Sequence, residues 1–339
     1  MILVLNCGSQ SIKYKIFDKE LKEYERFEIE VKNQKEYREK LEKIFKNIDK
    51  DIDLIGHRVV HGGNYFFEPV KINDNILKKL REISYLAPLH NPFNILGIEI
   101  SRKIFKNIDN YAVFDTGFFK DLPEVSKIYP LPEYIIKRFK IQRFGFHGLS
   151  YEYVLEKTSE ILKKPKGRLN LISCHLGGGG SICAIKNGKP IDISMGYTPL
   201  EGIMMMTRSG DIDPGIVILL AKNYGYDKAY EILNKESGMV ALSKKSSMLE
   251  IIENMKKGDK NCKLAFDLYV YRIKKYIGGY YAILGRIDAL VFTGKIGAGK
   301  RETRDAICKN LNFLKDVKVL SIKTDEEYLI AKKISRYLK

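Results

Sequence analysis

The chain has 339 residues, of which 45% are hydrophobic and 30% are charged, and this balance is typical of a globular protein with two domains. No apolar run is long enough to span a bilayer and the N-terminus lacks a secretory signal pattern, so we expect no membrane partner. The five cysteines are scattered and odd in number, which predicts reduced thiols in a cytoplasmic protein.

The formal net charge of +17 raises the question of a nucleic-acid partner. Most lysines, however, alternate with glutamates in segments of helical pattern such as 32–50 and 244–260. No dense basic tract with interleaved aromatic residues stands out. We therefore expect a lysine-rich solvated surface and no nucleic-acid partner, with a positive potential that helps to gather anionic substrates.

The first predicted elements in chain order are a buried strand at residues 2–5 and a second strand at 12–17, joined by a turn of small residues. The turn offers hydrogen-bonding side chains, and a lysine follows it; these residues are Asn6, Ser9, Ser11 and Lys13. The same strand–turn–strand pattern returns at 171–185. This repetition predicts two related domains, each with one phosphate-contacting hairpin.

The segment 55–63 has the pattern of a strand that ends in a glycine turn. His57 and His61 would share a face of this strand, which raises the hypothesis of a metal site. The sequence offers no third ligand nearby, so we favour hydrogen-bonded structural histidines. Arg58 falls on the opposite face, and an arginine in a short apolar strand needs an anionic partner.

Further polar residues lie at turns and strand ends. His90 lies in a proline-bracketed turn before a helix predicted at 93–106, and His147 lies between two glycines. Asp115 ends a predicted strand, which is where ligand-facing carboxylates lie in open α/β sheets. The five histidines all lie in such contexts and none follows His175, so their clustering favours a functional site.

The stretch 175–214 carries the most informative motif. A strand at 171–174 leads into four glycines at 177–180, and such a turn can cradle an anion with its backbone N–H groups. Further on, Arg208 lies close to Asp211 and Asp213 in sequence. A fixed cation beside carboxylates and a glycine turn suits phosphoryl groups and a metal.

Residues 215–283 are predicted to be largely helical, with amphipathic stretches at 215–224, 226–234 and 259–282. A buried strand at 289–293 then leads into the turn 294–300, which nearly fits the P-loop pattern. Arg301 replaces the hydroxyl residue of that pattern, and fewer than about 40 residues follow, too few for the rest of a P-loop domain. We favour a turn that packs against the base or ribose of a nucleotide.

Ten motifs in the same order resemble those of the acetate kinase family, within the actin, hexokinase and chaperone-ATPase fold class. They are NCGSQSIK, GHRVVHGG, LAPLHNP, FDTGF, RFGFHG, HLGGGGSICAI, MGYTPLEG, TRSGDIDP, FTGKIG and TDEE. The resemblance implies an α/β fold of two ribonuclease-H-like domains, with a nucleotide and substrate cleft between them. We expect an N-terminal domain at 1–119 plus 327–339 and a C-terminal, nucleotide-binding domain at 120–326.

The resemblance also implies roles for individual residues. The implied catalytic residues are Arg58, Asp115, His147 and Arg208. The residues implied to bind ATP are Asn6, Ser9, Ser11, Lys13, His175, Gly177, Gly178, Gly179, Gly294, Ile296, Gly297 and Arg304. The residues implied to bind the substrate are Arg58, Val60, Leu89, His90, Phe146 and Pro199, and the implied Mg²⁺ ligands are Asn6 and Glu326.

The implied reaction is the reversible in-line transfer of the ATP γ-phosphoryl group to acetate, giving acetyl phosphate and ADP. Since a carboxylate already carries its negative charge, catalysis needs positioning and charge neutralisation rather than a strong base. The alternatives are a propionate kinase or other short-chain carboxylate kinase, and a non-catalytic nucleotide-binding relative. The resemblance further implies a homodimer.

The chain departs from the family pattern at several positions. Gln10 replaces a serine, Gly178 replaces an asparagine, and Phe119 and Tyr151 each replace a histidine. The turn 294–300 lacks the usual Glu and Asn, which leaves the nucleotide base preference open. The chain is also shorter than is typical, with material missing between Lys13 and Arg58 and before Glu326.

Overall fold

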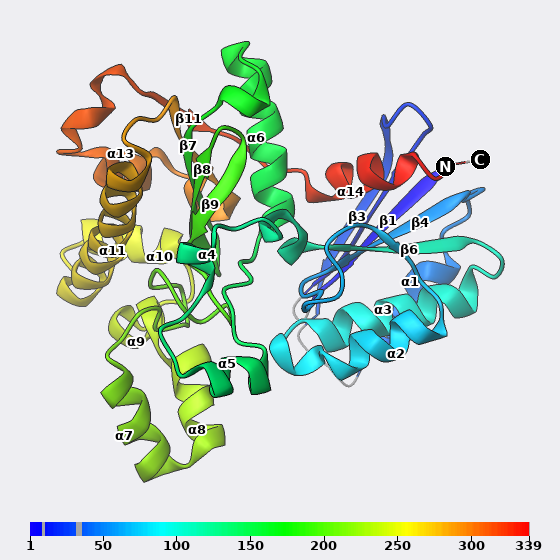
Figure 1. Ribbon diagram of the computed structural model, residues 1–339, viewed down its shortest axis with the longest axis horizontal. Helices are drawn as coiled ribbons and strands as arrows, with labels where there is room; N and C mark the ends of the chain where they lie inside the picture. The colour runs from blue at the N-terminus through cyan, green and yellow to red at the C-terminus, as the bar shows by residue number, and fades with distance from the viewer. Residues whose placement is uncertain (9–10, 32–35, 339) are drawn as a thin grey trace. The chain divides into compact units, whose positions relative to one another are not determined.

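The structure is a computed structural model that describes residues 1–8, 11–31 and 36–338. The chain divides into two compact units (Figure 1). Unit 1 comprises Met1–Lys120, Phe146–Tyr153 and Asp325–Lys339, and unit 2 comprises Asp121–Gly145 and Val154–Thr324. No helix in the described part of the chain is long and apolar enough to cross a membrane.

Unit 1 is built on a six-stranded sheet in the order β3-β2-β1-β4-β6-β5. Its strands are β1 (Ile2–Cys7), β2 (Ser11–Phe17), β3 (Glu23–Glu30), β4 (Leu54–Val59), β5 (Val70–Lys71) and β6 (Asp109–Phe114). Strands β1, β2 and β3 pair antiparallel, whereas β1, β4 and β6 run parallel. This arrangement brings the C-terminal ends of β1, β4 and β6 to one edge of the sheet.

Both faces of this sheet are covered by helices. Alternate side chains of β1 point to opposite sides of the sheet, and each set packs against different helices. Leu3 and Leu5 belong to a cluster with α1 (Tyr37–Lys46) and α3 (Asn91–Ile104), while Ile2 and Val4 belong to one with α14 (Glu326–Ser335). Unit 1 also contains α2 (Asp74–Glu82) and the short 3₁₀ helices η2 (Ser84–Leu86) and η3 (Asp115–Phe119).

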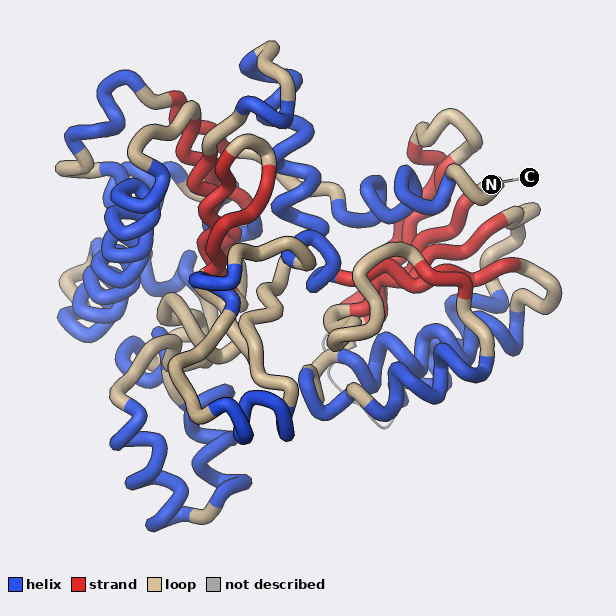
Figure 2. Tube along the Cα trace, in the orientation of Figure 1, coloured by secondary structure: helices blue, strands red, loops and turns tan. Residues whose placement is uncertain are grey.

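Unit 2 repeats the strand order and directions of β3-β2-β1-β4-β6 in unit 1, without a described counterpart of β5. Its sheet has the order β11-β10-β7-β8-β9, with β7, β8 and β9 antiparallel and β7, β10 and β11 parallel. The strands are β7 (Leu171–Leu176), β8 (Gly180–Lys186), β9 (Lys189–Ile193), β10 (Ala289–Thr293) and β11 (Lys318–Ser321), shown in red in Figure 2. The duplicated α/β domain predicted from the two strand–turn–strand patterns is therefore confirmed.

Unit 2 also contains several helices. They are α4 (Glu124–Lys127), α5 (Glu133–Phe139), most of α6 (Gly148–Leu162), α7 (Pro214–Tyr224), α8 (Tyr226–Glu231), α9 (Gly238–Ser243), α10 (Met248–Lys256), α11 (Lys260–Leu284), α12 (Gly294–Gly297) and α13 (Arg301–Cys308), with short 3₁₀ and π turns at η4 (Lys166–Arg168), η5 (Ile232–Glu236) and η6 (Asn312–Asp316). The long helix α11 buries one face in the core, including Tyr269 and Ile273.

Two expectations about the fold differ from the structure. Residues 215–224 were expected to form an amphipathic helix, but α7 buries none of its residues. The predicted second domain at 120–326 also included a segment, Phe146–Tyr153, that packs in unit 1. Leu149 joins the cluster of Ile2 and Leu329, and a side chain at Gly148 would collide with the Asp115 carbonyl.

Candidate active site

A group of largely buried charges in unit 1 lies where β4 and β6 end and α14 begins. Arg58 of β4 donates from Nη2 to Asp115 Oδ2 at 2.8 Å, and its Nε lies 3.2 Å from the same oxygen. Its Nη1 lies 2.8 Å from Glu326 Oε2 at the start of α14. One guanidinium thus joins two carboxylates, and the expectation that Arg58 has an anionic partner is confirmed.

Burial strengthens the coupling within this group. The exposed fraction of the side chain is 2% for Asp115, 17% for Arg58 and 13% for Glu326. Burial raises the pKa of the Asp115 carboxyl to about 6, with Arg58 opposing the rise and Glu326 adding to it. Burial alone would lower the pKa of Arg58, but Asp115 and Glu326 raise it above its ordinary value, so Arg58 stays charged.

The three acids at the N-terminus of α14 each bind a different strand. Besides Glu326 with Arg58, Asp325 lies 2.7 Å from Lys15 of β2, and Glu327 accepts a hydrogen bond from Asn6 of β1 at 2.9 Å. Sequence reasoning missed Lys15, Asp325 and Glu327 as neighbours of the site, although the TDEE motif was a signal. These contacts fix the start of α14 against the sheet.

The residues implied to bind Mg²⁺ lie within this group. Mg²⁺ is usually held by one or two carboxylates together with substrate phosphates and water. Glu326 and Asp115 share Arg58, and Asn6 contacts Glu327. In the described ranges no group of three or more His, Cys, Asp or Glu side chains could enclose a metal ion. The residues present therefore fit a partial site that phosphate oxygens would complete.

The N-terminal hairpin places Asn6 and Lys13 opposite each other in the β1–β2 register, so both side chains lie on one face of the sheet. Lys13 forms an ion pair with Glu28 of β3 at 2.7 Å. Ser11 begins β2, and its carbonyl accepts a hydrogen bond from Gly8 at 2.9 Å. Ser9, which was also implied to bind ATP, lies outside the described residues.

The residues implied to bind the substrate, other than Pro199, are in unit 1. Asn94 Oδ1 of α3 accepts a hydrogen bond from the Val60 backbone N–H at 3.1 Å, and Asn91 makes two hydrogen bonds of 3.0 Å with the His61 backbone. Leu89 and His90 lie half-buried immediately before α3. The Phe146 ring packs edge-on against the His61 ring at 5.5 Å. Sequence reasoning missed Asn91 and Asn94, which join the Val60 strand end to α3.

His57 and His61 are both hydrogen-bonded, as the sequence predicted. His57 is buried and its Nε2 lies 2.7 Å from Asn110 Oδ1, while His61 Nδ1 accepts a hydrogen bond from Gly63 at 2.9 Å. Burial lowers the pKa of His57 to about 4 and that of His61 to about 3, so both are neutral at pH 7. The interpretation of these residues as structural histidines is confirmed.

His147 is held in a backbone conformation that non-glycine residues rarely adopt, with φ at +60°. Such a conformation costs about 1 kcal/mol or more and persists where the surrounding structure fixes it. Tyr151 donates its backbone N–H to the His147 carbonyl at 3.1 Å. Its buried ring packs against the Phe119 ring at 6.1 Å, so the two positions where the resemblance implies histidines hold one aromatic pair.

In unit 2 the two glycine turns follow neighbouring strands. His175 of β7 is the register partner of Thr293 of β10. The turn after β7 is closed by a hydrogen bond from Gly177 N to Gly179 O at 2.9 Å. The turn after β10 begins at Gly294, whose φ of +79° and contact with the Leu176 carbonyl leave no room for a side chain. The two predicted nucleotide turns therefore lie side by side.

The turn 294–300 is itself partly helical. Residues Gly294–Gly297 form the short helix α12, and Arg304 of α13 donates to the Gly297 and Gly299 carbonyls at 2.9 and 2.8 Å. A cavity of about 310 Å³ opens beside it. This cavity is lined by Ser247, Met248, Leu249, Ile252, Lys295, Ile296, Gly299, Lys300 and Thr303. Ile296 thus lines the cavity, whereas Arg304 is not one of its lining residues and instead binds two carbonyls of the turn.

Arg208 is contributed by the segment that precedes α7. Its Nη1 donates to the Pro199 carbonyl at 3.3 Å, and burial lowers the pKa of its guanidinium. The carboxylates near it in sequence each contact protein groups. Asp211 accepts hydrogen bonds from Gly202 N and the Tyr276 hydroxyl at 2.7 and 2.6 Å, and Asp213 caps α7.

Comparison with known proteins agrees with the motifs. The model of the acetokinase family matches residues 28–337. Acetate kinase of Thermoanaerobacter pseudethanolicus is 40% identical, covering 100% of this chain and 99% of its own, and that of Dictyoglomus turgidum is 44% identical, covering 92% and 86%. The first alignment spans 397 positions, so that relative has segments that this chain of 339 residues lacks.

Solved structures point the same way. A crystal structure of Porphyromonas gingivalis acetate kinase has a TM-score of 0.88 and 36% identity, covering 100% of this chain and 99% of its own. A propionate kinase from Francisella tularensis has a TM-score of 0.89 and 34% identity, covering 98% of each chain. The family match, the relatives and the fold together show that this chain belongs to the acetokinase family and is a phosphotransferase of the kinase class.

Proposed function

We propose that this chain transfers the γ-phosphoryl group of ATP to the carboxylate of acetate, reversibly and with Mg²⁺. The observation that carries the proposal is the buried group of Arg58, Asp115 and Glu326. A guanidinium fixed by two carboxylates is a preorganised cation at the end of a strand, and such cations stabilise the charge of a transferring phosphoryl group. The named activity of the relatives supports the same reaction.

The proposed roles follow from what each side chain can do. The acetate carboxylate is already a nucleophile at pH 7, so no proton has to be removed. We therefore assign Asp115 the role of orienting Arg58. Arg58 and Arg208 neutralise negative charge, and His147 donates a hydrogen bond to the phosphoryl group. Glu326 and Asn6 would hold Mg²⁺, which when bound neutralises charge on the phosphate oxygens.

The nucleotide is assigned to unit 2. The glycine turn after β7 offers backbone N–H groups to phosphates, and the cavity beside Ile296 has room for a ring system. Lys300 is exposed and lines that cavity, so we assign it to the base side.

A second candidate substrate is propionate. The solved propionate kinase is about as similar to this chain as the solved acetate kinase, both in fold and in identity. One methylene in an apolar pocket changes specificity by only about 1–3 kcal/mol, so the two acids are expected to differ in degree.

The test is acyl phosphate formation, trapped with hydroxylamine as the hydroxamate, with acetate, propionate or butyrate. We expect acetyl hydroxamate that requires both ATP and Mg²⁺, with propionate weaker and butyrate weaker still. Nucleotide binding without hydroxamate from any of the three acids would contradict the proposal and favour a non-catalytic relative. A higher specificity constant for propionate would reassign the substrate.

We also propose a cytoplasmic homodimer that buries α7. This helix exposes a row of apolar side chains, with exposed fractions of 47% for Ile216, 69% for Ile218 and 59% for Leu219. Contiguous exposed apolar surface of this kind marks protein–protein contacts. Light scattering should give a dimer for the native chain and a monomer for the Ile218→Lys, Leu219→Lys double variant. Leu264→Lys, at a similarly exposed residue on α11, serves as the control and should stay dimeric.

A further inference from the structure

The segment 194–213 joins β9 to α7, and it carries Pro199 and Arg208 without any helix or strand. Arg208 Nη1 donates to the Pro199 carbonyl and also contacts Met205 Sδ at 3.7 Å, so the position of that carbonyl helps to place the guanidinium. What fixes Pro199 therefore matters for Arg208.

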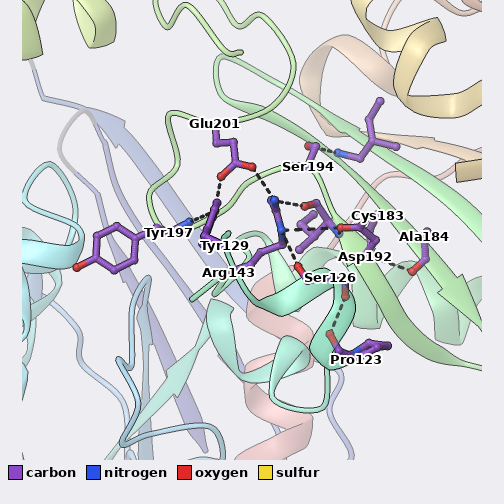
Figure 3. A network of polar contacts seen from close by, with 12 residues as sticks. Pro123, Ser126, Tyr129, Arg143, Cys183, Ala184, Asp192, Ser194, Tyr197 and Glu201 are labelled. Carbon is purple, nitrogen blue, oxygen red and sulfur yellow. Dashed lines mark hydrogen bonds and ion pairs between the residues drawn. The ribbon is translucent and has the colours of Figure 1, made fainter. Parts of the chain in front are cut away.

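A partly buried polar network anchors the chain on both sides of Pro199 (Figure 3). Glu201 accepts a hydrogen bond from Arg143 Nη2 at 2.6 Å with one oxygen and from the Tyr129 hydroxyl with the other. The same hydroxyl accepts a hydrogen bond from Tyr197 N at 2.8 Å. In the sequence, Pro199 thus lies midway between Tyr197 and Glu201, which both bind the Tyr129 hydroxyl.

The cation of this network is itself rigidly held. Arg143 donates from Nε to the Ser126 carbonyl at 3.0 Å and from Nη1 to the Ile193 carbonyl at 2.9 Å, and it lies over the Tyr129 ring at 5.3 Å. A side chain at Gly196 would collide with both the Glu201 carboxylate and the Tyr129 hydroxyl. Burial raises the pKa of Tyr129 above its ordinary value, so its hydroxyl stays protonated and keeps donating to Glu201.

A second anchor ties this segment to the residues that follow Arg208. Asp211 accepts a hydrogen bond from Gly202 N at 2.7 Å, and Asp211 N donates to the Gly202 carbonyl at 2.8 Å. From α11, the Tyr276 hydroxyl binds the Asp211 carboxylate at 2.6 Å and Arg272 binds its carbonyl at 2.9 Å. Arg208 is therefore in a loop closed at Gly202 and Asp211.

We propose that Tyr129, Arg143 and Glu201 are positioning residues for Arg208, which they reach through the Pro199 carbonyl. The loss of turnover that we expect when this network is broken rests on the proposed function. The expected effect on the position of the Arg208 side chain does not. None of the three is assigned to contact a substrate. Their loss should loosen the arginine without removing it.

The first measurement compares Tyr129→Phe with Tyr14→Phe. Tyr129→Phe keeps the ring over Arg143 but removes the hydroxyl that joins Tyr197 and Glu201. Tyr14→Phe is matched, because it also removes a tyrosine–glutamate hydrogen bond, that of Tyr14 with Glu25 at 2.5 Å in unit 1. We expect kcat for acyl phosphate formation to fall about tenfold in Tyr129→Phe, with the nucleotide KM within about twofold, and no change in Tyr14→Phe.

The second measurement repeats Tyr129→Phe in an Arg208→Lys background, where residual turnover is measurable. Residues that act through one another give non-additive losses. If the network acts through the guanidinium, Tyr129→Phe should change kcat by less than about twofold in that background. An equal tenfold loss in both backgrounds would show a general structural effect and overturn the proposal.

The third measurement needs no catalysis. Phenylglyoxal modifies accessible arginines, and mass spectrometry of peptides gives the rate at Arg208 alone. We expect modification at least about threefold faster in Tyr129→Phe and in Glu201→Gln, and an unchanged rate in Tyr14→Phe. Unchanged rates in all three variants overturn the positioning role. A native chain that forms no acyl phosphate refutes the proposed function, and the modification rates still decide this inference.

Discussion

Replacing Arg58 by methionine should make the stability of unit 1 depend on pH. Methionine keeps much of the side-chain volume but leaves Asp115 and Glu326 buried next to each other without their cation. Removing one partner of a buried ion pair costs about 3–5 kcal/mol, and two carboxylates remain here instead of one. We therefore expect a loss of about 3–5 kcal/mol in the free energy of unfolding at pH 8.

The loss should shrink as the pH falls. In the native chain the pKa of Asp115 is already about 6, above its ordinary value of 3.8, even with Arg58 opposing the rise. Without Arg58 that pKa must rise further, so the folded variant takes up a proton at a higher pH than the native protein does. Because its folded pKa lies above the unfolded one, the variant regains stability as pH falls through the folded pKa.

The assay is urea unfolding at pH 8, 7, 6 and 5, followed by circular dichroism because the chain has no tryptophan. If the two units unfold separately, hydrogen exchange in β4 and α14 identifies the transition of unit 1. Lys71→Met serves as the control, since it breaks the exposed ion pair with Asp109 and should change the free energy of unfolding little at any of these pH values. An equal loss for Arg58→Met at pH 5 and pH 8 would refute the reasoning.

Arg208→Ala should lower turnover about a hundredfold or more while leaving the fold intact, and Arg208→Lys should restore only part of it, as steady-state kinetics will show. Val60→Ala should raise the propionate-to-acetate ratio of specificity constants, and an unchanged ratio would remove Val60 from the pocket. Lys300→Ala should mainly raise the nucleotide KM, with GTP and ITP within about tenfold of ATP; a collapse of kcat at saturating nucleotide would favour the P-loop interpretation. Gly178→Asn should be tolerated, because a Cβ there meets no atom within 4 Å, and should lower the nucleotide KM.

Local patterns predicted the elements of the fold well where the apolar period was clear. The apolar runs of β1 and β7, each followed by a tight turn and a returning strand, predicted the duplicated domain. The assignment of Phe146–Tyr153 failed for a different reason. Its place is decided by Leu149 and Gly148, which pack against residues from distant parts of unit 1, and no local pattern encodes such contacts.

The candidate site shows the same division. The sequence predicted that Arg58 needs an anion, since burying an unpaired guanidinium is too costly. It could not say which one, because Asp115 and Glu326 lie on other elements and reach Arg58 only after the sheet and α14 are assembled. Tyr129 and Arg143 escaped notice for a similar reason: Tyr129 lies in a segment with no motif, and Arg143, although it opens the RFGFHG motif, binds Glu201 of another motif.

The acids at the start of α14 illustrate why a local interpretation can be correct and still incomplete. Acids at a helix N-terminus suit the helix dipole, and Asp325 does accept a hydrogen bond from Tyr328 N at 2.9 Å. The same three acids include Glu326, which forms an ion pair with Arg58. Apolar packing of α14 on the sheet brings Glu326 to that position. Ile330 and Ile334 lie against Gly56 of β4, where any larger residue would collide with them. The last helix therefore completes the charge group of a strand nearly the whole chain away, and a variant such as Gly56→Val should disturb Arg58 without touching a charged residue.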